Sequence, residues 1–123
     1  MARTFFVLAA FFSFLAVALG AFAAHGLRQR IPPDLLLTFE VAVRYQFYHA
    51  FALFIVAFAL MKFPEAGFAP SGWLFMAGIF IFSGSLYILS ITGIRWLGAI
   101  TPVGGLCFLA GWLWLAWVGW KTL

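Results

Sequence analysis

Four long apolar runs, separated by short polar links, limit the fold of this chain more than any other feature. Crossing the ~30 Å hydrocarbon core of a bilayer takes about 20 apolar residues in a helix. A helix satisfies its own backbone in lipid, and these runs are too long and too continuous for barrel strands. We predict an all-α membrane protein with spans at about residues 4–24, 45–61, 71–92 and 101–120.

The short links between consecutive spans favour an up-down antiparallel bundle of four transmembrane helices. Residues 1–123 would form it as a single integral membrane domain. Before the second span, residues 33–44 are expected to be an interfacial lead-in, because Pro33 can begin a helix. Within this lead-in, Glu40 and Arg44 stand four residues apart, in the order that favours an ion pair on a helix.

The composition excludes a water-soluble domain. Hydrophobic residues make up 67% of the chain and charged residues 8%, against about 25% charged residues in soluble proteins. The formal charge is +4, but the basic residues flank the apolar runs and form no patch, which is typical of membrane anchoring. We therefore expect membrane lipids, and no nucleic acid, as partners. The single Cys107 excludes an intramolecular disulfide.

The first apolar run resembles a signal peptide at its edges, with a basic start and an Ala21-Phe22-Ala23 ending. Its apolar stretch from Phe5 to Ala24 is, however, long enough to span a bilayer. Signal-peptide cores have only about 7 to 15 residues. We expect this segment to be a retained span.

Small residues indicate where helices meet, because close backbone approach replaces the missing hydrophobic drive in lipid. The first span carries such a stripe, spaced 4, 3, 4 and 4: Ala9, Ser13, Ala16, Gly20 and Ala24. The last span offers a shorter one, spaced 3 and 4: Gly104, Cys107 and Gly111. We expect both faces to point into the bundle.

Up-down threading places the first and third links on one side of the membrane, here called the distal side. Polar side chains gather toward that side, whereas tryptophans gather in the opposite half. On the second span, Gln46 and His49 are three residues apart and share one helix face. The candidate polar cluster comprises His25, Tyr45, Gln46, His49, Ser83, Ser85, Tyr87 and Thr101.

Several explanations of this cluster stay open from the residues alone. The side chains bond the helices together at one end, since a polar group in hydrocarbon needs a partner. Alternatively they line a small cavity that binds or conducts a solute, or His25 and His49 ligate haem or another metal. Glu40 and His49 are nine residues apart, on opposite faces of a helix, which disfavours catalysis. We expect no enzyme activity, cofactor or metal site.

The segments "LGAFAAHGL", "VRYQFYHA", "FSGSLY" and "TPVGGLCFLAGW" carry a resemblance to a known family. Over nearly its whole length the chain resembles the YgdD-like small inner-membrane protein family, domain of unknown function 423, which is related to transmembrane protein 256 of animal mitochondria. The resemblance implies a four-helix inner-membrane protein and implies no reaction. The matching positions are His25, Tyr45, Gln46, His49, Ser83, Gly84, Ser85, Tyr87, Thr101, Pro102, Gly104 and Gly105.

We expect a protein of the bacterial inner (plasma) membrane that acts through helix–helix association, as a scaffold, accessory subunit or modulator. It would form a homo-oligomer or join a larger membrane complex. The alternative is a small transporter, channel or ligand-binding protein with a polar cavity at one leaflet. Relatives in the family are richer in basic residues after the second span and at the C-terminus, which implies cytoplasmic termini.

Overall fold

A computed structural model describes residues 1–123, and all its regular elements are helical. Four helical stretches are long and apolar enough to cross a membrane: Ala2–Leu27, Pro33–Lys62, Ala69–Thr92 and Arg95–Thr122. The predicted all-α fold with four membrane-length helices is therefore confirmed.

Two π-helical turns and one 3₁₀ turn interrupt these stretches. In chain order the elements are α1 (Ala2–Phe22), the π turn η1 (Ala23–Leu27), α2 (Pro33–Lys62), α3 (Ala69–Gly78), the π turn η2 (Ile79–Ser83), α4 (Gly84–Thr92), the 3₁₀ turn η3 (Arg95–Ala99) and α5 (Thr101–Thr122). Proline suits the first turn of α2, because its missing N–H has no partner there anyway. The helix then runs unbroken, so the residues expected as an interfacial lead-in are its first three turns.

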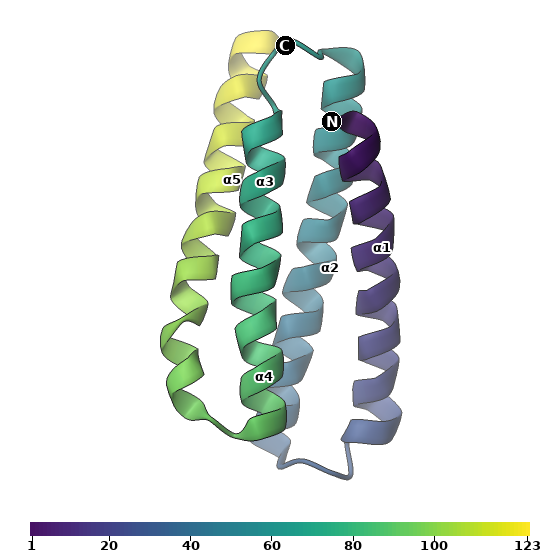
Figure 1. The fold of residues 1–123 in the computed structure, drawn as a ribbon, viewed down its shortest axis with the longest axis vertical. Helices are drawn as coiled ribbons and strands as arrows, with labels where there is room; N and C mark the ends of the chain where they lie inside the picture. The colour runs from purple at the N-terminus through teal and green to yellow at the C-terminus, as the bar shows by residue number, and fades with distance from the viewer.

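Successive helical stretches run in opposite directions along one long axis (Figure 1). The α1–α2 link and the α4–α5 link lie together at the lower end in this view, which is the distal end. The α2–α3 link and both termini lie at the upper end (Figure 1). At the distal end α4 stops at Gly93, whose φ of 72° is the left-handed conformation that commonly ends a helix.

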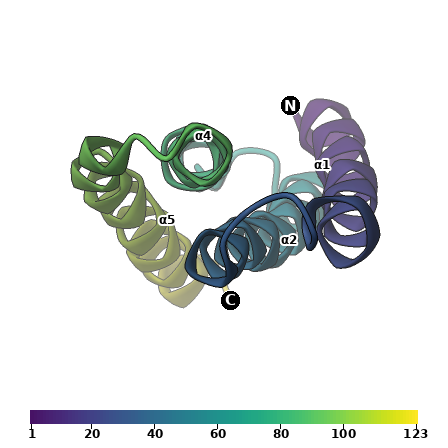
Figure 2. The ribbon, with the colours of Figure 1, turned by 90° about the horizontal axis from the view of Figure 1, so that it is seen from below.

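The four helical stretches are not equivalent in the bundle. Seen from the distal end, α2 and α4 lie in the middle, with α1 and α5 on opposite sides of them (Figure 2). Helix α1 packs chiefly on α2, and α5 packs chiefly on α3 and η2. The two outer helices therefore present most of their surface outward.

The apolar core fills the half of the bundle near the termini. It includes Phe5 and Phe12 of α1, Leu53 and Val56 of α2, and Phe75 of α3. The distal half has only a small second cluster, formed by Ala23, Leu27 and Phe39. The two ends of the bundle are thus held together by different kinds of contact.

Close packing in the apolar half pairs phenylalanine rings with glycines on facing helices. A Cβ added at any of these glycines would lie too close to the facing phenylalanine. Small residues permit such close approach between membrane helices. The pairs are Phe5–Gly72 between α1 and α3, and Phe108–Gly78 and Phe75–Gly111 between α5 and α3. Nearer the distal end, Gly104 of α5 packs against the backbone and Cβ of Phe82 in η2 and not against its ring.

The small-residue stripes of the outer helices face different neighbours. On α1, Ala9 and Ala16 are fully buried, and Gly20 lies against Val43 of α2. Ser13 is half-buried, and its Oγ is shielded from solvent without a hydrogen-bond partner. On α5, the buried stripe comprises Gly104 and Gly111, which face η2 and α3. The stripes do not meet, because α1 and α5 lie on opposite sides of the bundle (Figure 2).

Adjacent glycines of α5 provide a matched test of this packing. A Cβ at Gly104 would lie 2.7 Å from Phe82 Cβ and 2.8 Å from its Cα, whereas one at Gly105 would meet only Phe82 Cδ2, at 3.9 Å. Gly104→Ala should therefore destabilise the protein by about 1–3 kcal/mol. Gly105→Ala should be neutral or stabilising by up to about 1 kcal/mol. Thermal unfolding in detergent measures both, and equal effects would contradict the packing described.

Candidate functional site

Gln46 joins three helical stretches in the distal half of the bundle. Its side chain is 3% exposed, and its Nε2 donates a hydrogen bond to the backbone oxygen of Phe12 in α1 at 2.9 Å. Its Oε1 accepts a hydrogen bond from the Tyr87 hydroxyl in α4 at 2.6 Å. Both ends of the amide are therefore satisfied by neighbouring helices.

Two serines of the third span bond to two different neighbours. Ser83 donates to the backbone oxygen of Ala42 in α2 at 2.8 Å, and the hydroxyls of Ser85 and Thr101 lie 2.6 Å apart between α4 and α5. Positions 83 and 87 are one helical turn apart and both face α2, whereas position 85 faces α5. The third span is therefore bonded to the helix on each side of it.

His49 bridges α2 and α5 through Trp112. The Trp112 indole N–H donates to His49 Nε2 at 3.1 Å, and His49 Nδ1 lies 2.7 Å from the backbone oxygen of Tyr45. The carbonyl only accepts a hydrogen bond and the indole only donates one. We therefore assign His49 as a neutral imidazole with its proton on Nδ1. The ring also stacks on Phe108, with centroids 3.5 Å apart and planes 6° apart.

The residues of the candidate polar cluster divide into four bridges and two outliers. Gln46–Tyr87 links α2 to α4, Ser83 links η2 to α2, and Ser85–Thr101 links α4 to α5. His49 adds the fourth bridge with Trp112, which was not among the predicted residues. Tyr45 is 38% exposed, with its ring beside that of His49. His25 lies in η1, exposed and without a side-chain hydrogen bond.

Some bonding partners of the cluster were missed from the sequence. Two of them are backbone oxygens, at Phe12 and Ala42, which no residue type reveals. Trp112 had a usable signal, since it stands eleven residues along α5 from Thr101 and therefore reaches the level of His49. No group of three or more His, Cys, Asp or Glu side chains is placed to hold a metal ion.

Two pockets lie beside the bridges. One, of about 560 Å³, is a groove between α2 and α5, whose lining includes Tyr45, His49 and Trp112. The other, of about 580 Å³, lies at the distal end, between η1 with the adjoining Arg28 and the first turns of α2. Neither is lined by Gln46 or Tyr87, whose polar groups are turned to one another.

The single ion pair of the protein joins η3 to the first turn of α2 at the distal end. Arg95 Nη2 lies 3.0 Å from Asp34 Oδ2, and both side chains are exposed. Helix α2 rises over about 45 Å, so its first turn extends beyond a ~30 Å hydrocarbon core. There the hydrogen bond from Arg95 lowers the pKa of Asp34. The ion pair expected between Glu40 and Arg44 does not form.

The bond between Gln46 and Tyr87 can be measured by a double-mutant cycle. Gln46→Leu and Tyr87→Phe each remove one partner, and we expect a coupling free energy of about 0.6–1.7 kcal/mol between them, the range of hydrogen bonds between membrane helices. Unfolding of the four proteins in detergent gives this value. Tyr48→Phe is the control, because Tyr48 is exposed and its effect should add to that of Gln46→Leu. A coupling of zero for Tyr87 would contradict the bridge.

Comparisons with known proteins place the chain in a family. The family model described as "Protein of unknown function (DUF423)" matches residues 19–105. The UPF0382 membrane protein YwdK of Bacillus subtilis is 50% identical over 112 residues, which cover 90% of this chain and 91% of that protein. The UPF0382 membrane protein SH2409 of Staphylococcus haemolyticus is 44% identical over 92% of each chain. No solved structure matches. The chain therefore belongs to the DUF423 family of membrane proteins, as its sequence motifs indicated.

Proposed function

We propose that this protein acts through helix–helix association in the bacterial inner membrane, as a scaffold, accessory subunit or modulator of a larger assembly. One observation carries the proposal: Gln46, His49, Ser83, Ser85, Tyr87 and Thr101 all hydrogen-bond to groups within the chain, most of them on another helix. Polar groups used in this way build a rigid bundle. They leave few hydrogen-bonding groups for a substrate.

The outward face of α5 supports association with another helix. It is apolar, and Leu106, Leu113 and Trp117 on it are exposed. Ala110 lies among them in a shallow hollow that Leu113, Trp114 and Trp117 also line. A small residue set between large ones lets a second membrane helix approach closely. On this proposal a homo-oligomer or a larger complex forms through α5.

The proposal assigns the chain no catalytic role. A general acid–base pair needs two titrating groups within reach of one proton. Glu40 lines the distal pocket beside α1, whereas both ring nitrogens of His49 are engaged on the other side of α2. These positions support a function in which Glu40 and His49 do not act together as an acid–base pair.

Filling the hollow on α5 tests the association. Ala110→Trp should shift the protein to a lower mass in mild detergent, because the added ring separates the two helices. Ala10→Trp is the matched control, since Ala10 is exposed on the outward face of α1 and its replacement should leave the mass unchanged. Light scattering after size-exclusion chromatography gives the masses. A wild-type protein that is strictly monomeric and brings no partner through purification would overturn the proposal.

The groove between α2 and α5 favours a second candidate function, the binding or transport of a small molecule. Its volume of about 560 Å³ lies within the range of about 300–1,000 Å³ that holds small ligands. His49→Ala separates the two functions. Association requires that this variant lose stability or assembly, because it leaves the Trp112 N–H unpaired. Binding instead requires a folded, assembled variant that has lost a molecule carried by the wild type.

We propose that both termini face the cytoplasm, so that the bridged distal end faces the periplasm. Basic residues lie on both sides of the bundle, with Arg3, Lys62 and Lys121 at the end of the termini and Arg28 and Arg95 among those at the distal end. A reporter that is active only in the cytoplasm should therefore be active when it is fused after Leu123. The same reporter fused within the distal Arg28–Ile31 link should be inactive. Activity of a periplasmic reporter at Leu123 would reverse the orientation.

A further inference from the structure

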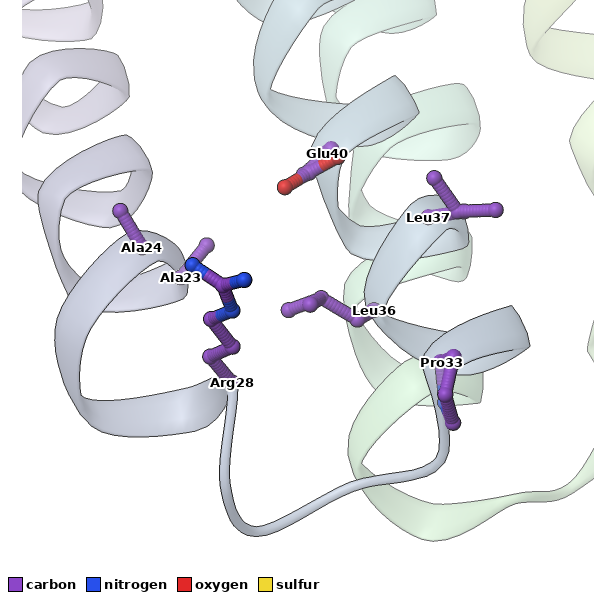
Figure 3. Close-up of a pocket in the computed structure, with 7 residues that line it drawn as sticks. All are labelled: Ala23, Ala24, Arg28, Pro33, Leu36, Leu37 and Glu40. Carbon is purple, nitrogen blue, oxygen red and sulfur yellow. The ribbon is translucent and has the colours of Figure 1, made fainter.

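The pocket at the distal end carries two charged side chains among apolar ones. Its volume is about 580 Å³, and it is lined by Ala23, Ala24, Arg28, Pro33, Leu36, Leu37 and Glu40. Figure 3 shows the Arg28 guanidinium and the Glu40 carboxylate reaching into the space between the end of the first helical stretch and the first turns of α2. The two charges therefore enter the pocket from opposite walls.

Neither charge has a partner within the protein. Arg95–Asp34 is the only ion pair within 4.0 Å, and the side chains of Arg28 and Glu40 form no hydrogen bond. Glu40 is also free of Arg44, one turn further along α2. A cation and an anion that face one pocket without contacting each other match a ligand that carries both charges, separated by a few bonds.

The position of the pocket in the bundle identifies the kind of ligand. The first two helical stretches have 26 and 30 residues, so they rise about 39 and 45 Å and exceed a ~30 Å hydrocarbon core. Because Arg28, Arg30 and Asp34 stand at their distal ends, we place these ends in the layer of lipid headgroups. Leu36 and Ala24 provide an apolar wall at the same place, as the start of an acyl chain requires.

We propose that this pocket binds a phospholipid whose headgroup carries a primary ammonium, of the phosphatidylethanolamine type. The guanidinium of Arg28 binds the phosphate, for which its planar array of donors is suited. The carboxylate of Glu40 accepts hydrogen bonds from the ammonium. A lipid with an uncharged headgroup alcohol, such as phosphatidylglycerol, satisfies Arg28 alone and leaves Glu40 without a cation. A choline headgroup has no N–H to donate.

Lipid competition on the full-length protein tests the site. Native mass spectrometry in detergent compares phosphatidylethanolamine, phosphatidylglycerol and phosphatidylcholine with identical acyl chains. The wild type should retain phosphatidylethanolamine about two- to fivefold more tightly than either competitor. Phosphatidylglycerol lacks the ion pair with Glu40, and phosphatidylcholine lacks the hydrogen bonds of that pair. Equal retention of the three lipids by the wild type would overturn the proposal without recourse to any variant.

Substitutions then assign the two charges. Glu40→Gln should abolish the preference for phosphatidylethanolamine, and Arg28→Gln should weaken the retention of all three lipids. The matched controls are Glu65→Gln, in the link at the opposite end, and Arg44→Gln, which lies outside the pocket lining. Neither control should change the preference. A preference that survives Glu40→Gln, or that either control removes, would overturn the proposal, with helicity by circular dichroism confirming that each variant is folded.

Discussion

The hydrogen bonds of Gln46 are the interaction on which the distal half of this bundle depends. Hydrocarbon offers no water to a polar group, so a buried amide such as that of Gln46 needs partners within the protein. Gln46 has two polar ends, and α1 and α4 each provide one partner. A single amide in α2 therefore fixes three helices relative to one another. An apolar residue at this position could contact the same helices but would not select their rotation.

The helices of the two halves of the bundle are held together by different kinds of contact. Near the termini, phenylalanine rings fill the space above glycines, as Phe5 does at Gly72, and shape alone aligns the helices. Toward the distal end the core thins, and Ser83 and Ser85 hold the third span to α2 and to α5. Directional bonds thus replace shape complementarity where less apolar volume is available.

The sequence predicted the number of spans, their order and the side on which polar residues gather, because apolar run length and up-down threading determine all three. It did not predict which groups would meet. The bonds of Gln46 and Ser83 end on backbone oxygens of Phe12 and Ala42, which depend on the rotation of each helix about its axis. Gly72 and Gly78 were also missed, because their role appears only with the phenylalanine on a facing helix. The Glu40–Arg44 spacing predicted an ion pair that tertiary structure leaves unmade.

The two unpaired charges of the distal pocket lie apart from the surface proposed for association. Buried polar side chains of the distal half bond to one another or to backbone oxygens and contribute to the fold, whereas Arg28 and Glu40 remain free at its edge. Their pocket lies between the α1 side and α2, and the apolar hollow at Ala110 lies on α5, the outer helix of the opposite side (Figure 2). A lipid bound in the first therefore leaves the second open. On the proposal of lipid binding, the headgroup contacts α2 through Glu40, and α2 is the helix that the bond between His49 and Trp112 joins to α5.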